Sequence, residues 1–242
     1  MRIAVLSDIH GNLVGLDACL ADLHAQGGAD AIIAAGDLCL DGPKPKKVLQ
    51  RLEEVGAQAI RGNTDRYLGA PGNETFETLE HAQLEWTRHD VGEKYLRFLA
   101  ELPFAIRIGD DGHQLLVVHA NPANDDEHLW PDADDETLER LIGAEPASTI
   151  AFGHLHLPYV RVWRGKTLVN VATAGLPKDG DARVGYTIFT ERSGGWEIKQ
   201  RRVEFDVKKV ATQLASCGIP GSEELIATLR RHRYKRLKGY VP

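Results

Sequence analysis

Residues 3–12 read Ile-Ala-Val-Leu-Ser-Asp-Ile-His-Gly-Asn, and this stretch decides the fold. Its first half, residues 3–7, is a short apolar run that opens a polar segment. A run of this kind is typical of a strand that is buried on both faces of a sheet. The sequence therefore predicts a buried strand that is followed directly by polar residues.

A helix is predicted immediately after this strand. Asn12 is suited to cap its first turn, Gly27-Gly28 ends it, and its apolar face is formed by Leu13, Leu16, Leu20 and Leu23. A second buried strand over 31–35, a helix that starts after Pro45 and a third strand over 57–60 come next. This β-α-β-α-β order predicts a parallel sheet with right-handed crossovers.

The rest of the chain has a different pattern. Residues 65–102 are polar and helical in period, and we expect them to form helices that cap the sheet or the site. Strand-like runs return at 114–118, 149–152, 166–171, 184–190 and 196–205. Their shorter connections favour more antiparallel pairing, and we expect the second half to build a second sheet against the first.

The chain is predicted to form a single domain over residues 1–242, because it contains no repeat and no Pro/Gly/Ser-rich linker. Within it we expect a helical insertion over about 65–102 and a helical C-terminal tail over about 207–242. Residues 125–145 carry nine acidic side chains and one basic residue, which predicts a solvated loop and helix. Residues 229–238 carry six Lys or Arg, which is typical of a solvated helical tail.

Composition excludes several classes of protein. The 242 residues include 43% hydrophobic residues, enough for a real core, and carry a formal net charge of −6. The acidic balance argues against general nucleic-acid binding. No apolar run approaches the ~18 to 20 residues needed to span a bilayer, and the N-terminus has no signal-peptide pattern. We therefore expect a cytoplasmic protein that does not associate with membranes.

Polar side chains follow five of the predicted strands at the point where each strand ends. Asp8 and His10 follow the first strand and, one residue apart, point the same way on extended backbone. The other residues in such positions are Asp37, Asn63, His119, His154 and His156. In an open α/β sheet the loops beyond the carboxyl ends of the strands converge on one crevice, where ligands bind.

Each of these residues alone has an ordinary explanation. A lone Asp after a strand is usually a turn or cap residue, a Gly-Asn pair is a common turn, and a lone His is more often a surface or hydrogen-bonded residue than a ligand. Together they form a set of seven N and O ligands without thiolate, which suits Mn, Fe, Zn, Co or Ni. Seven ligands are too many for one tetrahedral zinc, so two metals are the economical interpretation.

The ordered pattern of these residues resembles the signature of the calcineurin-like metallophosphoesterases, and in particular their small bacterial and archaeal phosphodiesterases. The pattern spans residues 8 to 156 and consists of Asp8-x-His10, Gly36-Asp37, Gly62-Asn63-x-Asp65, His119 and Gly153-His154-x-His156. The resemblance implies an α/β fold in which two mixed β-sheets pack as a sandwich flanked by helices. It implies two divalent ions, of which manganese is favoured, with Asp37 as the bridging ligand. One ion would be held by Asp8, His10, Asp37 and His156, and the other by Asp37, Asn63, His119 and His154.

The chain departs from the family pattern in three places. Many members place a His after the ligand Asn, where it assists the leaving group, but this chain has Thr64. Phosphodiesterase-like relatives often lack that His as well, so we expect turnover but not of substrates with poor leaving groups. Ala120 replaces a common Gly after the ligand His119, and a late loop that resembles Asn-Pro-Gly-Ser reads Asn170-Val171-Ala172-Thr173.

The predicted activity is hydrolysis of phosphodiesters or activated phosphate esters by a hydroxide that bridges the two metals. The substrate is expected to be a small phosphoester of nucleotide type, and the protein is a candidate homo-oligomer. Asp37, Asn63 and Asp65 are the predicted catalytic residues, with Asp65 orienting a ligand or water. Weaker candidates for contact with substrate phosphate are Lys178, Arg183 and Arg61.

Three alternatives stay open at this point. A nuclease on the same site is disfavoured by the acidic composition, and a phosphoprotein phosphatase by the absence of His at position 64. A non-catalytic binding module is the third, because the retromer scaffold subunit resembles this fold without being a competent enzyme. The complete ligand set disfavours it. Six of the ten histidines have no chemical partner in the sequence pattern, namely His24, His81, His89, His113, His128 and His232.

Overall fold

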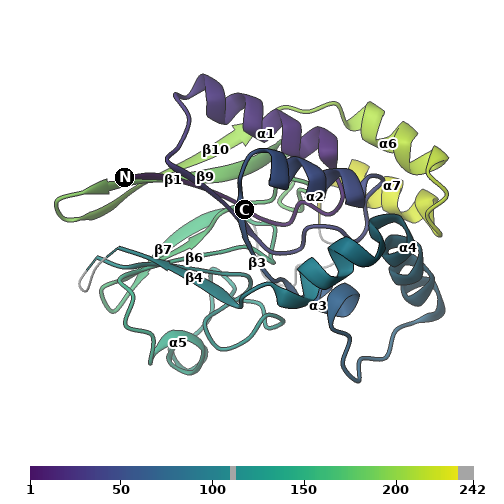
Figure 1. Cartoon of the computed structure of the whole chain (residues 1–242). Helices are drawn as coiled ribbons and strands as arrows, with labels where there is room; N and C mark the ends of the chain where they lie inside the picture. Colours follow the sequence, from purple (N-terminus) through teal and green to yellow (C-terminus); the bar gives the residue numbers. More distant parts are fainter. Residues whose placement is uncertain (110–112, 234–242) are drawn as a thin grey trace.

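The computed structural model describes residues 1–109 and 113–233, and these residues form two five-stranded sheets that pack face to face (Figure 1). The strand order of the first sheet is β10 (Gly195–Val203), β9 (Val184–Arg192), β1 (Arg2–Leu6), β2 (Ala31–Ala35) and β3 (Gln58–Ile60). The order of the second is β4 (Ala105–Ile108), β5 (Leu115–Val118), β6 (Thr149–Phe152), β8 (Lys166–Asn170) and β7 (Tyr159–Trp163). Three parallel strands form part of each sheet, β1–β2–β3 and β5–β6–β8, and antiparallel strands complete both. The predicted fold class is confirmed.

Strand β1 is buried on both faces, as its apolar run predicts. Alternate residues of a strand point to opposite faces. Ile3 and Val5 pack between the sheets in a cluster that includes Val117. Ala4 and Leu6 pack on the other face in a separate cluster with residues of the covering helices. This strand therefore contributes to two core layers. Each fully buried aliphatic side chain stabilises the fold by about 1.5 to 3 kcal/mol.

Helices cover the outer faces of both sheets (Figure 1). The first sheet is covered by α1 (Leu13–Ala25), α2 (Pro45–Glu54) and α4 (Thr78–Glu101), and residues of α5 (Asp135–Ile142) pack in the core of the second. Asn12 caps α1 as predicted, since its side-chain oxygen accepts from the Gly15 N–H at 2.9 Å. Among the described residues, no helix combines the length and the apolar character that a membrane crossing requires.

The segment 65–102, for which we expect a helical insertion, is helical except for residues 70–77 and its C-terminal residue. It contains most of α3 (Asn63–Gly69) and the whole of α4, which is broken at Gly92, where φ is +74°. The C-terminal helices α6 (Val207–Ser216) and α7 (Ser222–Arg231) pack on each other through a small apolar cluster. Residues 234–242 of the predicted tail, with three of the six basic side chains of residues 229–238, lie outside the described residues.

Two strand predictions need correction. We expected the second half of the chain to build the second sheet, but β9 and β10 join the first, where β9 pairs antiparallel with β1 and sets Ile3 opposite Phe189. The strands β4 and β7 had no predicted counterpart. Both lie at the edges of the second sheet, and β7 leaves Val160 and Val162 exposed. An edge strand is only partly buried, so its sequence carries a weaker apolar pattern than β1 does.

Candidate metal centre

All seven predicted ligands meet at one edge of the molecule, beyond the carboxyl ends of five parallel strands. Asp8 and His10 follow β1, Asp37 follows β2, and Asn63 begins α3 after β3. From the second sheet, His119 follows β5, and the pair His154 and His156 follows β6. Six of them form two trios, and within each trio the ligand atoms lie within 4.8 Å of one another. The trios are Asp8, His10 and His156, and Asp37, His119 and His154.

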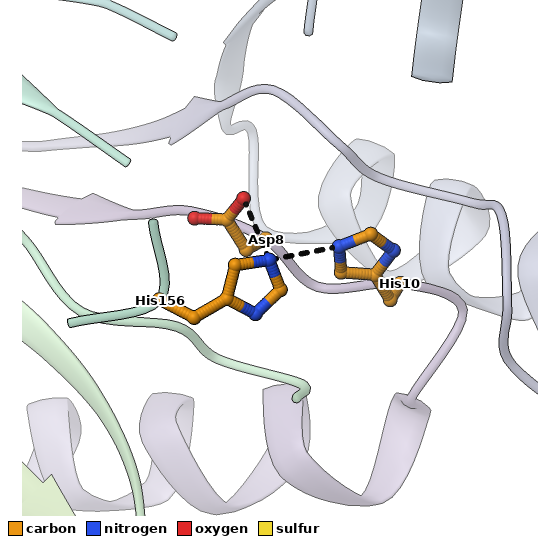
Figure 2. Close-up of side chains that lie close together, drawn as sticks. All are labelled: Asp8, His10 and His156. Carbon is orange, nitrogen blue, oxygen red and sulfur yellow. Dashed lines mark hydrogen bonds and ion pairs between the residues drawn. The ribbon is translucent and has the colours of Figure 1, made fainter. Parts of the chain in front are cut away.

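In the first trio, all three side chains are buried and point toward one another (Figure 2). The Nε2 atom of His156 lies 3.3 Å from Nε2 of His10 and 3.4 Å from Oδ1 of Asp8. The two imidazole rings are stacked, with their centroids 5.0 Å apart. Ligands from β1 and β6 therefore converge on one point although they belong to different sheets.

In the second trio, the Nε2 atom of His119 is the central atom. It lies 3.2 Å from Nδ1 of His154, 3.4 Å from Oδ1 of Asp37 and 3.1 Å from the side-chain oxygen of Asn63. Asn63 is thus the fourth member of this group. His119 is fully buried, and Asp37 is 3% exposed.

Asp37 lies between the two groups. Its Oδ1 faces His119, and its Oδ2 lies 3.7 Å from Nε2 of His10 in the first trio. A carboxylate with one oxygen toward each group has the geometry that a bridging ligand needs.

The backbone fixes which nitrogen of each histidine faces the cluster. A carbonyl oxygen only accepts, so the ring nitrogen bonded to it must carry the proton, and the other ring nitrogen is left with a lone pair. The four bonds run from His10 Nδ1 to the Leu40 carbonyl (3.0 Å), His119 Nδ1 to Ala35 (2.9 Å), His156 Nδ1 to Leu176 (2.5 Å) and His154 Nε2 to Asp126 (2.8 Å). Each trio therefore contains two unprotonated nitrogens that face each other.

This arrangement fits divalent cations. Two lone pairs about 3.3 Å apart repel unless a proton or a cation lies between them. Ligand atoms bound to one ion at about 2.0 to 2.1 Å lie roughly 3 to 3.4 Å from each other, which is the spacing of the facing nitrogens in both trios. Bonds from the outer ring nitrogens to carbonyls are also the usual way in which proteins orient histidine ligands.

Five of the seven side chains stand on left-handed backbone. The φ angles are +52° at Asp8, +48° at His10, +54° at Asp37, +66° at His154 and +57° at His156. Such a conformation costs about 1 to 3 kcal/mol for a residue other than glycine, and it clusters at functional sites. Asp, Asn and His tolerate it better than most residues.

Two glycines of the sequence pattern allow the loops to approach closely. A Cβ atom at Gly153 would overlap the Ser7 hydroxyl and the Asp8 carboxylate, and one at Gly62 would overlap the Asp37 carboxylate. Any side chain at these positions would push a predicted ligand out of place.

Asp65 acts on the ligands through the backbone. Its fully buried carboxylate accepts hydrogen bonds from the N–H groups of Asp37 (2.8 Å), Leu38 (3.0 Å) and Gly62 (2.9 Å). These bonds tie the loop that carries Asp37 to the loop that carries Asn63. Burial, together with the negative charge of Asp37, raises the pKa of Asp65 to about 7.

Thr64 contacts the same ligand directly. Its backbone N–H and its hydroxyl both donate to Oδ1 of Asp37, at 3.0 and 2.8 Å. Sequence analysis marks Thr64 only as the place of an absent histidine, so this role is a finding of the structure.

The loop Asn170-Val171-Ala172-Thr173 supports the first trio. The Thr173 hydroxyl donates to the backbone carbonyl of Asp8 at 2.7 Å. The Asn170 amide donates to the carbonyl of Gly153 at 2.6 Å. The loop therefore holds the backbone of two ligand segments, although it departs from the family pattern.

The electrostatics favour a charged carboxylate at Asp37 and neutral imidazoles at His154 and His156. In contrast, burial raises the pKa of Asp8 to about 6, and at His119 the charges of Asp37 and Asp8 outweigh burial and raise the pKa. Burial alone would raise the pKa of Asp37, but His119, His10 and His154 outweigh it and lower this pKa to about 2. Burial and the neighbouring His119 lower the pKa of His154 to about 3, and burial also lowers that of His156. These two imidazoles are therefore neutral near pH 7, as a metal ligand must be.

Part of the acidic segment 125–145 borders the site, although the sequence predicts it to be solvated. Asp125 is 6% exposed, and its carboxylate accepts from Arg61 and from Arg66, at 3.2 to 3.3 Å. The carbonyl of Asp126 binds His154, and its carboxylate accepts from Arg66 at 2.5 Å. The rest of the segment forms α5 and its exposed surroundings.

His128 also lies at the site. Its ring is 4.2 Å from that of His154 and stacks on Trp130 at 5.5 Å between centroids. The sequence does not predict this position of His128, because His128 and His154 become neighbours only in the folded chain.

The three weaker candidates for phosphate contact have different charged partners. Arg61 is engaged with Asp125, and Arg183 forms an ion pair with Asp181. Lys178 interacts electrostatically with Asp8, Asp41 and Asp37, so its ammonium group lies near the cluster, and burial lowers its pKa.

Comparison with known proteins agrees with this geometry. A family model described as the calcineurin-like phosphoesterase superfamily domain matches residues 1–194. The uncharacterized protein MJ0912 of Methanocaldococcus jannaschii is 29% identical over 236 residues, which cover 90% of this chain and 93% of that protein.

Two solved structures share the fold over nearly their whole length. A metallophosphoesterase from Sphaerobacter thermophilus has a TM-score of 0.77 and 25% identity, covering 96% of this chain and 99% of that one. The hypothetical protein PH1004 from Pyrococcus horikoshii has a TM-score of 0.84 and 19% identity, covering 96% and 98%.

Proposed function

The chain belongs to the calcineurin-like phosphoesterase superfamily, and from this premise we propose that it hydrolyses phosphodiesters or activated phosphate esters with two divalent metal ions. The family makes the protein a phosphoesterase, and the ligand trios are suited to divalent metal. The observation that carries the dinuclear proposal is the position of Asp37, with one oxygen toward each trio.

The proposed ligands divide as the resemblance implies. Asp8, His10, Asp37 and His156 would hold one ion, and Asp37, Asn63, His119 and His154 the other. Manganese is the metal that we expect in both places. Bound divalent ions lower the pKa of water, polarise phosphoryl oxygens and neutralise charge in the transition state.

The charge of the proposed ligands would leave the metal-loaded site positive, which favours an anion. Asp8 and Asp37 contribute two negative charges at most, and the four imidazole ligands are neutral when they coordinate metal. The loaded site is therefore positive although the chain as a whole carries −6. A phosphate group is attracted locally against the global charge.

The leaving group receives no proton from position 64. The Thr64 hydroxyl donates to Asp37, so it is committed to the ligand. This arrangement supports a preference for diesters and activated esters, and we expect a small nucleotide-type molecule as the substrate.

Activity assays test the proposal directly. The protein is stripped with chelator, and bis(p-nitrophenyl) phosphate and p-nitrophenyl phosphate are assayed with Mn, Ni, Co, Zn or Mg added back. We expect metal-dependent turnover in which the diester is hydrolysed at least as well as the monoester. A strong preference for the monoester would exclude the phosphodiesterase assignment, and no metal-dependent turnover of either would exclude catalysis.

Asp37→Asn tests the ligand assignment. The amide lacks the charge and one of the oxygen donors that a bridging position needs, so we expect the variant to lose both metals. Asn tolerates the left-handed backbone at this position, so the fold is kept. Elemental analysis measures metal per chain, with circular dichroism as the check on folding. Two metals per chain in the variant would show that Asp37 is not the bridge.

A further inference from the structure

A cavity of about 660 Å³ opens beside the metal centre and shares its walls. Four of its lining residues contact predicted ligands, and one of them is Leu40, whose carbonyl accepts from His10 at 3.0 Å. The Tyr67 hydroxyl accepts from the Asn63 amide at 3.4 Å, the Leu176 carbonyl accepts from His156, and Asp41 Oδ2 lies 3.9 Å from Nδ1 of His10. The cavity therefore adjoins the metal centre, and its lining residue Lys178 interacts electrostatically with Asp8 and Asp37.

The helical insertion and α7 supply most of the residues that line the cavity. Its walls include the first turns of α4 and α7, which lie next to each other in Figure 1. The two are tied together, because the Gln83 amide donates to the Pro220 carbonyl at 3.0 Å. Most of the lining therefore comes from elements other than the strand-end loops that supply the proposed ligands, although Leu40 and Asp41 belong to the loop that carries Asp37.

One part of the lining is aromatic and apolar. The rings of Tyr67 and Phe76 meet edge to face with their centroids 5.1 Å apart. Leu79 is 39% exposed, and Leu84 and Leu225 add further apolar surface. A ring laid against this surface would bury apolar area and gain an aromatic contact. The volume also lies within the roughly 300 to 1,000 Å³ of small-molecule sites.

The charged part of the lining is mainly acidic. Among the described residues around the cavity, four are carboxylates and one is a lysine, Lys178. The carboxylates are Asp41, Glu77, Glu80 and Glu224. Lys178 interacts with Asp8 and Asp37, so its charge lies toward the metal centre. A second phosphate carried into the cavity would meet like charges, which is unfavourable.

We propose that this cavity binds the non-leaving group of the substrate, and that it selects an uncharged aromatic group such as a nucleoside and rejects one that carries further phosphate. The inference rests on the proposed phosphoesterase function and assigns its substrate class. The substrate is a phosphodiester with a single phosphate, and dinucleoside polyphosphates and oligonucleotides are excluded.

Three esters with the same p-nitrophenol leaving group test the proposal on the manganese-loaded enzyme. Methyl p-nitrophenyl phosphate leaves the cavity empty, thymidine 5′-(p-nitrophenyl phosphate) places a nucleoside there, and the 3′-phosphorylated form of the second adds charge. We expect kcat/KM for the thymidine ester to exceed that of the methyl ester at least tenfold. We expect the 3′-phosphate to lower kcat/KM of the thymidine ester at least tenfold.

Variants assign these differences to the cavity. Phe76→Ala and Leu79→Ala should each lower the thymidine-to-methyl ratio of kcat/KM at least threefold, mainly through KM. Phe98→Ala is the matched control, because Phe98 is an exposed aromatic residue of α4 outside this cavity. Its ratio should stay within twofold of wild type. Leu79 is partly exposed, so its truncation also tests the proposal if Phe76→Ala does not fold.

The double variant Glu77→Gln/Glu80→Gln tests the rejection of charge. In this variant, the ratio of kcat/KM for the thymidine ester to kcat/KM for its 3′-phosphorylated form should fall at least threefold. Equal kcat/KM for the methyl and thymidine esters, or unchanged ratios in the cavity variants, would overturn the inference while leaving the phosphoesterase function in place. Absence of metal-dependent turnover of all three esters would instead contradict the proposed function itself.

Discussion

Thr64 has a different role from the one that the family pattern gives to its position. It follows the proposed ligand Asn63, and both its N–H and its hydroxyl donate to Asp37. Where the family resemblance predicts an imidazole for the leaving group, this chain has a group that donates to the carboxylate that we propose as the bridge. The residue therefore supports metal binding and not proton transfer.

Thr64→Val tests this role, because valine keeps the shape and removes the hydroxyl. We expect Mn²⁺ affinity to fall about tenfold, in the range that supporting hydrogen bonds of metal ligands contribute. Calorimetric titration of the apo protein measures the affinity. Thr64→Ser keeps the hydroxyl and should bind metal as the wild type does. Equal affinity in the Val variant would mean that the backbone N–H alone positions Asp37.

The convergence of the proposed ligands was predictable from the sequence, whereas the atoms that orient them were not. Asp8, His119 and the other ligands follow apolar runs, and this position places them at one edge of the sheets. The partners of the histidines are backbone carbonyls, for example those of Leu40 and Leu176. Every residue has a carbonyl, so no side-chain pattern identifies the one that becomes a partner.

The loop 121–128 supports one side of the candidate metal centre. Asp125 anchors it through Arg61 and Arg66, and the next residue, Asp126, accepts from His154 with its carbonyl. The ligands of the first trio are held by carbonyls of other segments, at Leu40 and Leu176. The histidines of the two trios are therefore held by different parts of the chain.

Asp125→Asn should weaken one metal position and spare the other. Loss of the charge loosens the ion pairs with the two arginines, so the carbonyl of Asp126 holds His154 less well. We expect titration with Mn²⁺ to show one of two dissociation constants raised about tenfold. Glu127→Gln is the matched control in the same loop, since Glu127 pairs with Arg140 at the surface. An equal change in both constants would contradict a local effect.

A second pair of elements is joined by a charged network. On α1, the carboxylate of Asp22 accepts from Arg201 Nε (2.9 Å) and Nη2 (2.8 Å) and from the Tyr186 hydroxyl (2.8 Å). The hydrogen bond from Arg201 is the largest cause of the lowered pKa of Asp22. This network fastens α1 to β9 and β10, the strands whose sheet was predicted wrongly.

The network predicts a pH-dependent contribution to stability. Because the folded pKa of Asp22 lies below its unfolded value of about 3.9, its contribution is complete above that pH and is lost as the pH falls through the folded pKa. We expect Asp22→Asn to lower the free energy of unfolding by about 2 kcal/mol at pH 7, and by less below pH 4. Urea unfolding at several pH values measures this. Asp17→Asn is the control, because it affects a more exposed ion pair of the same helix, and it should lower the free energy of unfolding by less than about 1 kcal/mol. If the loss of stability in Asp22→Asn did not depend on pH, the assignment would be contradicted.

The local elements followed from the sequence, and the pairing of distant ones did not. The β-α-β-α-β start was predicted because short apolar runs alternate with segments of helical period. The antiparallel pairing of β1 with β9 joins residues such as Ile3 and Phe189. Nothing within either strand specifies its partner, since both are apolar runs that would fit either sheet.

For the whole molecule, metal removal is expected to lower stability. Two buried carboxylates and four histidines converge without an ion to balance their lone pairs, and any ligand that binds only the folded state stabilises it. Free Mn²⁺ at 100 times its dissociation constant would contribute about 2.7 kcal/mol per site, which corresponds to a rise in Tm of roughly 5 to 10 °C. Scanning calorimetry of chelator-treated protein with and without Mn²⁺ measures the shift. The shift should vanish in Asp37→Asn, and an unchanged Tm in the wild type would show that the folded chain does not bind the ion.

The two trios also connect the two sheets mechanically. Each takes ligands from both, and His10 and His156 are 146 residues apart in the chain. An ion bound by them is a removable cross-link, so the sheets cannot part at this edge until coordination bonds break. Local opening of the sandwich and release of metal are then coupled steps. Amide hydrogens at the carboxyl ends of β1 and β6 should exchange more slowly in the loaded protein, while those at the opposite ends of the same strands exchange at nearly the same rate with or without metal.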